Sequence, residues 1–364
     1  MEHSKIGKSL TDVIELFVRK KGGLGSASVF ACAIFGSISG SGAATLSCIG
    51  SIMFPKLKER GYPTGYTAAL LASSAPLGLL IPPSMAQILY AWITGQSVLA
   101  CFLAIVGPGI FLAVMLAIVN KVLVRRMPSV IEGAAALKTD GFEGETLNTG
   151  QRFFRAIPAL LMPVIILGSI YGGLLTPTES AAVSVIYAIP VGWFVYKGLN
   201  WMNFKRALRE SGTTTGVVMV MLFFVMQFSR ILTMENIPTA IAEGLVALSD
   251  NKIIIMIMVN IFMIIIGMLM DDTSAMLICA AILAPVVTSI GVIGLNTGMG
   301  NITPPTAPLL YMSARVCNAK VNEMMKPNLI FILFAWLPVL IIVTYVPEIS
   351  LWLPKLVFPQ IFGL

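Results

Sequence analysis

Long apolar stretches that recur along the whole 364-residue chain, separated by short polar loops, constrain this sequence more than any other feature. Only 11% of the residues are charged, whereas soluble domains carry about 25%. A helix needs roughly 20 apolar residues to cross the hydrocarbon core of a bilayer, and several stretches reach that length. The sequence therefore predicts an all-α polytopic membrane protein.

The positive charges lie in particular loops. The net charge is +7, and lysines and arginines cluster in loops 121–155 and 197–210, whereas loop 234–251 carries acidic residues and no Lys or Arg. Positively charged loops stay on the cytoplasmic side of a membrane. We therefore expect the first two loops in the cytoplasm and the third outside. Because the positive charges lie in short loops next to membrane spans, we exclude a nucleic-acid partner.

Histidine and cysteine usage narrows the chemistry. The only histidine is His3, in a polar leader over residues 1–26, so a mechanism that needs a histidine base or ligand is excluded. The cysteines are odd in number, scattered and without CxxC spacing, which favours small buried side chains over a metal site or disulfides. No nucleotide-binding motif occurs, and no organic cofactor is expected. The cysteines are Cys32, Cys48, Cys101, Cys279 and Cys317.

Two apolar stretches carry a polar tip. Residues 27–54 are interrupted at 36–42 (GSISGSG), and residues 252–290 are interrupted at 271–274 (DDTS). The second stretch is either two full spans with carboxylates at a cytoplasmic turn or a re-entrant hairpin, since non-helical backbone is tolerated at membrane depth where protein buries it. We prefer the hairpin, because neither end carries the basic cluster of the inner loops. For 36–42, a small-residue packing patch is the structural alternative.

A second pair of interruptions reveals an internal repeat. Residues 78–84 (GLLIPPS) and 300–306 (GNITPPT) share the pattern Gly-x-x-x-Pro-Pro-Ser/Thr, and each follows a polar-tipped stretch. The first stretch starts from the basic side and the second from the acidic side. The sequence therefore predicts inverted repeats with two re-entrant hairpins and two broken helices, with cores at 27–120 and 252–346. In such folds substrate and ions bind near the midplane.

The chemistry of the breaks favours transport. Tandem prolines remove two backbone donors and break a helix, so the carbonyls before them lose their partners. Those carbonyls and nearby Ser or Thr hydroxyls suit a dehydrated cation such as Na⁺, and opposed helix N-termini suit an anionic substrate. An ion channel is the main alternative, and an intramembrane enzyme is a third, with Glu179, Asp271 and Asp272 as its only candidate acids.

At these residues the chain resembles the large membrane subunit of a tripartite ATP-independent periplasmic (TRAP) transporter. The resemblance runs from about residue 5 to the C-terminus. Its motifs are 36–41 (GSISGS), Pro55 with 60–62 (RGY), 81–84 (IPPS), 107–109 (GPG), 176–181 (TPTESA), 270–273 (MDDT) and 303–306 (TPPT).

The resemblance implies an elevator-type carrier of the ion-transporter superfamily in a bacterial inner membrane, driven by a Na⁺ gradient. The carried anions would be small organic acids resembling C4-dicarboxylates or sialic acid. A small four-helix membrane subunit and a periplasmic binding protein would be its partners, in addition to the lipid bilayer.

The resemblance also implies site residues. One Na⁺ site would use Ser39 and Ser41 at the first tip with Gly78, Ile81 and Pro83 at the first break. Reading the repeat across, a second Na⁺ site would use Asp272, Thr273, Gly300, Thr303 and Pro305. The anion would lie between the tips, at Ser41, Ser84, Asp272 and Thr306.

The chain departs from the family pattern in two places. Members usually have further membrane helices before the segment that matches residues 5–26, so a fragment, a late start or a split gene is expected. Pro55 to Pro82 spans 27 positions, whereas Pro285 to Pro304 spans 19, which shortens the second arm by about 12 Å at 1.5 Å per helical residue. The departures put the second ion site in question and leave a non-transporting remnant as an alternative.

Overall fold

The structure, a computed structural model, describes residues 23–127, 130, 149–236, 240, 243–244, 251–283 and 290–357. Within these ranges every regular element is a helix, which confirms the predicted all-α fold class. The first part contains α2 (Gly23–Ser39), α3 (Gly42–Glu59), α4 (Thr64–Ser74), α5 (Leu77–Leu80), α6 (Met85–Thr94), α7 (Val98–Val124), α9 (Thr149–Tyr171), α10 (Pro177–Pro190), the π-helix η2 (Val191–Val195) and α11 (Trp201–Met234). The second part contains α13 (Lys252–Leu269), α14 (Asp272–Leu283), α15 (Ile290–Gly300), α16 (Pro308–Val316), α17 (Val321–Phe331), the π-helix η3 (Ile332–Trp336), α18 (Leu337–Tyr345) and α19 (Glu348–Val357).

Several helices have the length and composition of membrane spans. In the described part of the chain, four continuous helices qualify: α7, α10 with η2, α11, and α17 through α18. A fifth span is bent, because α4 and α5 meet α6 at 44° across the break that contains Pro82 and Pro83. Together these helices make the chain a multi-pass membrane protein.

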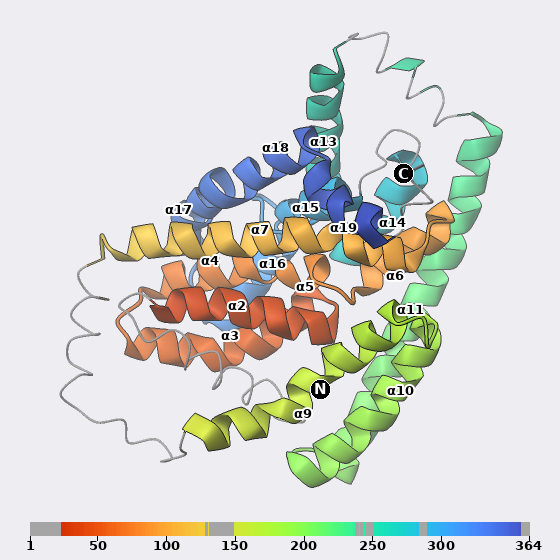
Figure 1. The fold of residues 1–364 in the computed structure, drawn as a ribbon. Coiled ribbons are helices and arrows are strands. Elements are labelled where there is room, and N and C mark those ends of the chain that lie inside the picture. The colour runs from red at the N-terminus through yellow and green to blue at the C-terminus, as the bar shows by residue number, and fades with distance from the viewer. Residues whose placement is uncertain are drawn as a thin grey trace.

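The two predicted hairpins form the centre of the molecule. In the first hairpin, α2 and α3 pack against each other, and α2 also packs against α4, α5 and α7. In the second hairpin, α13 packs against α14 and, along most of its length, against α15. Figure 1 shows α2, α3, α4 and α7 running side by side, with α13, α14 and α15 gathered beyond them. Each hairpin therefore lies on the broken helix that follows it in the sequence.

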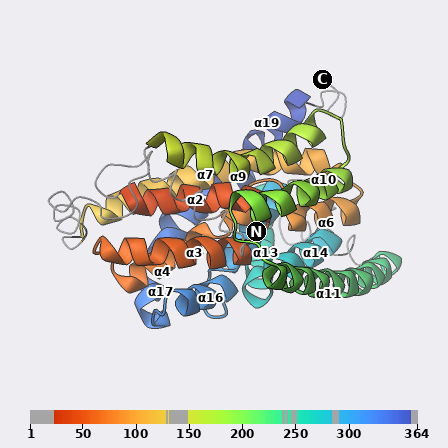
Figure 2. The same cartoon turned by 90° about the horizontal axis from the view of Figure 1, so that it is seen from below.

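The outer halves of the broken helices cross over to the other hairpin. Helix α6, which follows the first break, packs against α14 of the second hairpin. Helix α16, which follows the second break, packs against α3 of the first hairpin. Both pairs can be followed in the view from below (Figure 2). Two repeats related by a two-fold axis would show this reciprocal packing. That the two repeats start from opposite sides of the membrane stays a prediction.

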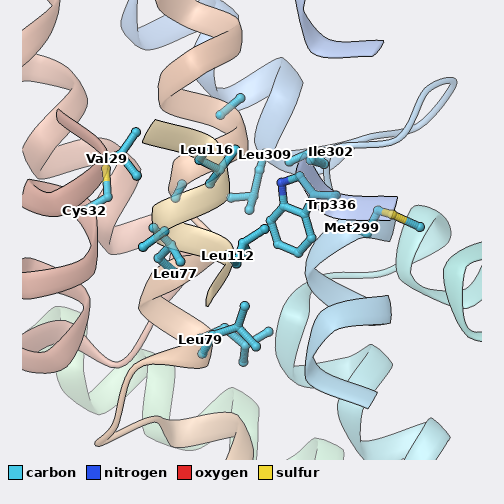
Figure 3. Packing of buried hydrophobic residues seen from close by; sticks show 14 of the residues in the cluster. Val29, Cys32, Leu77, Leu79, Leu112, Leu116, Met299, Ile302, Leu309 and Trp336 are labelled. Atoms are coloured by element: carbon cyan, nitrogen blue, oxygen red, sulfur yellow. The ribbon is translucent and has the colours of Figure 1, made fainter. Parts of the chain in front are cut away.

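A continuous apolar core holds the two hairpins together. Phe35, Phe102, Phe331 and Trp336 are among its largest fully buried side chains. Figure 3 shows the Trp336 indole beside Ile302 and Leu309, which flank the second break. The five cysteines are all buried and form no disulfide within the described residues, as the sequence predicted from their apolar surroundings. Burial on this scale fixes how the hairpins and breaks lie relative to each other.

Helices α9, α10 and α11 form a peripheral arm. Helix α9 pairs with α10, and α11 runs along one edge of the molecule, where it contacts α14 (Figure 1). Only 6% of the most apolar 18-residue window of α11 is buried. A helix that is apolar and exposed all round faces lipid or another protein.

Two predicted loops were wrong in extent. A loop was predicted at 197–210, but residues 201–210 belong to α11. The segment contains no proline, and the Asn200 side chain caps the helix by accepting a hydrogen bond from the Asn203 N–H at 2.7 Å. The predicted loop 121–155 is helical at both ends, within α7 and α9. The middle of that loop, most of the leader at 1–26 and most of loop 234–251 lie outside the described residues.

Candidate functional site

The first hairpin turns within two residues. Helix α2 continues through Ser39, so the polar tip predicted at 36–42 is narrowed to Gly40 and Ser41. Gly40 has a φ of +64°, a left-handed conformation that costs glycine little. Ser41 then starts α3 in an extended conformation, and its side chain accepts from the Ala44 N–H. The chain therefore reverses abruptly here and leaves polar groups at the turn.

Three oxygen atoms gather at this tip. The Ser39 Oγ and Thr45 Oγ1 atoms lie 3.0 Å apart, and Thr45 Oγ1 donates to the Ser41 carbonyl at 2.8 Å. Ser39 Oγ also donates to the Ser41 carbonyl at 3.3 Å. Hydroxyl and carbonyl oxygens are ligands that hard cations prefer. Thr45 was not among the predicted residues, although it lies one helical turn after Ser41.

The first break lies directly against this tip. Pro82 and Pro83 lack the N–H groups that would bond the carbonyls of Gly78 and Leu79 in a continuous helix. A Cβ atom on Gly78 would lie 2.5 Å from Thr45 Oγ1 and 2.8 Å from the Ser41 carbonyl oxygen. Glycine is therefore the residue that lets the break reach the tip.

Further contacts complete the first tip and break. A Cβ atom on Gly36 would lie 2.5 Å from the Gly78 Cα, and one on Gly40 would lie 2.9 Å from the Pro83 carbonyl oxygen. The Ile81 side chain contacts α7 instead, since its Cδ1 lies 2.7 Å from a Cβ placed on Gly109. Of the predicted first Na⁺ set, the structure thus brings together Ser39, Ser41, Gly78 and Pro83. Ile81 lies in the same break, but its side chain points to α7.

The second hairpin turns at Met270 and Asp271, at the start of the polar break predicted at 271–274. Asp271 caps α14, because its carboxylate accepts from the Thr273 N–H at 3.1 Å and from the Ser274 hydroxyl. Asp272, the first residue of α14, is only partly exposed. The two neighbouring carboxylates therefore have different environments, one as a cap and one turned into the protein.

Asp272 joins the two hairpin tips. Its carboxylate accepts a hydrogen bond from the Asn301 side-chain amide at the second break and lies against Gly42, the first residue of α3. A Cβ atom on Gly42 would lie 2.8 Å from an Asp272 carboxylate oxygen. The N-termini of α3 and α14 therefore meet at one carboxylate.

The second break repeats the glycine contact of the first. A Cβ atom on Gly267 would lie 3.2 Å from the Gly300 Cα, and one on Gly300 would lie 2.6 Å from the Gly267 Cα. Gly267 lies five residues before Asp272, as Gly36 lies five residues before Ser41. The same pairing of hairpin glycine and break glycine thus occurs at both tips.

The sequence profile described as "Tripartite ATP-independent periplasmic transporter, DctM component" matches residues 1–349. The chain belongs to the DctM family of TRAP transporters. It is therefore a permease subunit of a transporter and not an enzyme, as predicted.

Several relatives of this DctM-family chain are named by their transported compound. It is 33% identical to an isethionate TRAP transporter permease protein (DctMQ) from Oleidesulfovibrio alaskensis, over 91% of this chain and 52% of that one. It is 34% identical to a C4-dicarboxylate large permease (DctM) from Pseudomonas aeruginosa, over 92% and 78%. It is 28% identical to a sialic acid large permease (SiaM) from Vibrio cholerae, over 92% and 78%. The chain thus spans about half the length of the first relative.

The second predicted Na⁺ set of this DctM-family chain is assembled in part. Asp272 lies against Asn301, which directly follows Gly300 in the break. The Thr303 hydroxyl donates to the Met299 carbonyl at 2.6 Å, and the Pro305 carbonyl accepts from Tyr311 at 2.8 Å. Thr273 is buried in the first turn of α14. Thr303 and Pro305 thus have other partners within their own repeat.

The predicted substrate residues fall into two groups. Ser41 and Asp272 lie where the tips meet, because the Asp272 carboxylate lies against Gly42, next to Ser41. Ser84 is buried near Gly40, and its hydroxyl has no hydrogen-bond partner. Thr306 is exposed, and its hydroxyl donates to the Met268 carbonyl of the second hairpin. The structure therefore joins Ser41 with Asp272 and holds Ser84 and Thr306 each at its own tip.

A groove separates the second hairpin from α11. Its volume is about 540 Å³, and its walls are apolar except for Asp271 and Ser274 at the tip. Sequence reasoning missed it because its two walls are about 50 residues apart. The residues that line it are Val220, Met221, Phe224, Val225, Leu269, Met270, Asp271, Ser274 and Ile278.

The segment from Thr176 to Glu179 has a structural role at the start of α10. The Thr176 side chain accepts from the Glu179 N–H at 3.3 Å, and the Glu179 carboxylate accepts from the Thr176 N–H at 2.8 Å. This reciprocal capping box starts α10. The segment is thereby explained without a part in the candidate site.

Proposed function

We propose that this permease is a secondary transporter that couples Na⁺ entry to the uptake of small organic anions resembling C4-dicarboxylates or sialic acid. It would work in the bacterial inner membrane with a small four-helix membrane subunit and a periplasmic binding protein. One observation carries the proposal: the N-termini of α3 and α14, from the two hairpins, meet at the carboxylate of Asp272.

That meeting point suits an anion. The first turn of a helix presents unpaired N–H groups and the positive end of the helix dipole. Two such ends at one place attract negative charge, and Asp272 supplies one negative charge between them. Relatives named for isethionate, C4-dicarboxylate and sialic acid all handle anions, which supports the same class of substrate here.

The coupling ion would bind at the oxygen clusters. Ser39, Ser41 and Thr45 place two hydroxyls and one carbonyl within hydrogen-bond distance of one another, beside the break at Gly78. A dehydrated monovalent cation needs such uncharged oxygen ligands. At the second tip, Asp272 with the break around Gly300 would provide the corresponding site, with Thr273 next to it.

The shortened second arm does not separate its tip from its break. Pro285 to Pro304 is eight positions shorter than Pro55 to Pro82, which is about 12 Å at 1.5 Å per residue. Nevertheless Gly267 and Gly300 remain in contact. This contact supports a working second site over a non-transporting remnant.

The test is uptake into proteoliposomes that contain this chain together with a small TRAP membrane subunit and a periplasmic binding protein from the same organism. Labelled succinate, sialic acid and isethionate would be offered under an inward Na⁺ gradient or an equal K⁺ gradient. We expect accumulation of at least one anion only with Na⁺. Equal uptake with K⁺ would refute Na⁺ coupling, single-channel conductance would indicate a channel, and no uptake in either gradient would indicate a remnant.

A further inference from the structure

Each helix break contains one carbonyl that a buried side-chain amide holds. At the first break, Gln87 Nε2 on α6 donates to the Leu79 carbonyl at 2.7 Å. At the second break, Asn328 Nδ2 on α17 donates to the Ile302 carbonyl, also at 2.7 Å. Both side chains are 0% exposed. Water therefore cannot replace either amide.

These carbonyls have lost their helical partners. In a continuous helix the Leu79 carbonyl would accept from residue 83, which is a proline and has no N–H. The Ile302 carbonyl would accept from residue 306, but the chain leaves the helix at the second break. Buried carbonyls without a partner are rare in proteins, so the amides supply what the breaks remove.

The neighbouring carbonyls of the second break already have backbone partners. Gly300 accepts from the Thr303 N–H at 2.9 Å, and Asn301 accepts from the Leu309 N–H at 3.1 Å. The Ile302 carbonyl is the one that a side chain completes. Asn328 therefore finishes the hydrogen bonding of this turn and fixes its peptide planes.

Asn328 also connects the second break with the first. Its Oδ1 atom accepts from Ser73 Oγ at 3.2 Å, and the Ser73 carbonyl accepts from Trp336 Nε1 at 3.2 Å. Ser73 lies in the last turn of α4, four residues before α5 and the first break. Ser73, Asn328 and Trp336 are all fully buried. The amide that holds the second break is thus anchored on the helix that leads to the first.

Gln87 has one unused atom. Its Oε1 has no hydrogen-bond partner, and the same is true of the Ser84 hydroxyl one helical turn earlier on α6. Both side chains are at most 1% exposed. An amide whose donor is engaged and whose acceptor is free indicates that the contact with the Leu79 carbonyl decides the orientation of the Gln87 side chain.

We infer that Gln87 and Asn328 are positioning residues for the two helix breaks. Each ties down one carbonyl and thereby sets the direction of the remaining break carbonyls, of which that of Pro83 lies against the first tip. That these carbonyls bind Na⁺ rests on the proposed function. Groups that orient ligands from the second shell typically change metal affinity 10–100-fold when removed.

The experiment measures the thermal midpoint of the purified chain against Na⁺ concentration, with KCl keeping the ionic strength constant. We expect Gln87→Met and Asn328→Leu each to raise the Na⁺ concentration needed for half-maximal stabilisation by about tenfold or more. A general loss of packing would lower the thermal midpoint without moving that concentration. Should either variant not fold, Gln87→Asn, whose amide is one methylene short, or Asn328→Thr takes its place.

Asn296→Leu is the matched control. Asn296 is also a fully buried amide that donates to a carbonyl, that of Val292 at 2.9 Å, but within the regular part of α15. We expect it to lower the thermal midpoint and to leave the Na⁺ dependence within about twofold, because the breaks keep their partners. Unchanged Na⁺ dependence in both break variants, or an equal change in Asn296→Leu, overturns the inference.

A second readout separates this inference from the proposed function. If Na⁺ does not stabilise the wild type more than K⁺, the coupling proposal fails, and amide hydrogen exchange without Na⁺ decides the inference. Gln87→Met should then raise exchange at 77–88 and not at 300–309, and Asn328→Leu should do the reverse. Exchange equal to wild type in both segments refutes the positioning role.

Discussion

Asp271 and Asp272 show how adjacent identical residues take different roles through local geometry. Asp271 precedes α14 and accepts from the N–H of Thr273, so its charge caps the helix. Asp272 is one position further along and turns about 100° around the helix axis, which directs it to Gly42 and Asn301. The sequence indicated a pair of carboxylates at a polar break. In the structure Asp271 caps α14, and Asp272 lies between the two hairpin tips.

Replacing Asp272 tests the link between tips. Asp272→Asn removes the charge between the two helix N-termini and leaves one acceptor oxygen beside Gly42 and Asn301. Hydrogen bonds to charged groups are worth about 1.5–3 kcal/mol, so we expect Na⁺-driven uptake to fall roughly tenfold or more. Initial rates in proteoliposomes, normalised to the inserted protein, measure the effect.

Asp271→Asn is the control for that experiment. Asparagine caps helices about as well as aspartate, so uptake should stay within about twofold of wild type. A comparable loss in both variants would show that charge at the second tip in general, and not the contact with Gly42, is what transport needs.

At the scale of elements, the glycine pairs determine how closely a hairpin approaches its break. Gly36 meets Gly78, and Gly267 meets Gly300, with no room for a methyl group in either pair. Small residues allow helices in membranes to approach closely. Here the approach brings a hairpin tip against broken backbone, so the glycines position the candidate ion ligands.

Gly78→Ala and Gly300→Ala test that approach. A methyl group at either position overlaps backbone or a tip hydroxyl by about 1 Å, and misplacement on that scale can lower a rate roughly hundredfold. We expect near-complete loss of uptake while the protein still inserts, since each change adds one methyl group. Uptake and the yield of folded protein from size-exclusion chromatography are the measurements.

Gly216→Ala on α11 is the matched change in open space. Nothing lies within 4 Å of a Cβ at that position, and alanine forms helices better than glycine. Its uptake should equal that of wild type. A normal rate in Gly78→Ala would instead mean that the tip and the break separate during transport without cost.

The sequence predicted the elements better than it predicted their partners. Tandem prolines and polar tips locate the breaks at residues 82–83 and 304–305, because a proline acts on its own helix. The helical segment 201–210 was predicted as part of a loop because its charges were interpreted as an inner turn. Thr45, Gln87, Asn301 and Asn328 were missed, since nothing in a single sequence states that an amide on one helix lies against a carbonyl on another.

At the scale of the whole molecule, the exchange of outer halves ties the two hairpins into one body. Because α6 packs on α14 and α16 packs on α3, neither hairpin can move far without the other. The peripheral helix α11 is different, because it touches this body mainly at α14, beside an apolar groove. An elevator motion of the kind the family resemblance implies would therefore slide the body past α11.

A cross-link between α11 and the second tip tests this motion. The Ser274 hydroxyl and the Met221 sulfur are 4.0 Å apart across the edge of the groove, so Met221→Cys with Ser274→Cys is within reach of oxidative cross-linking. The native cysteines are replaced first. We expect oxidation to abolish uptake and a reductant to restore it, because the link fastens the body to the peripheral arm.

The control link lies inside the body, between α3 and α16. A Cβ on Gly50 would lie 3.1 Å from Val316 Cγ1, so Gly50→Cys with Val316→Cys can form a cross-link between the two repeats. Since α3 and α16 belong to the same moving body, this link should form and leave uptake nearly unchanged. If it blocks transport while the Met221–Ser274 link does not, the two repeats move against each other and α11 moves with the second hairpin, which is the reverse of the elevator expected here.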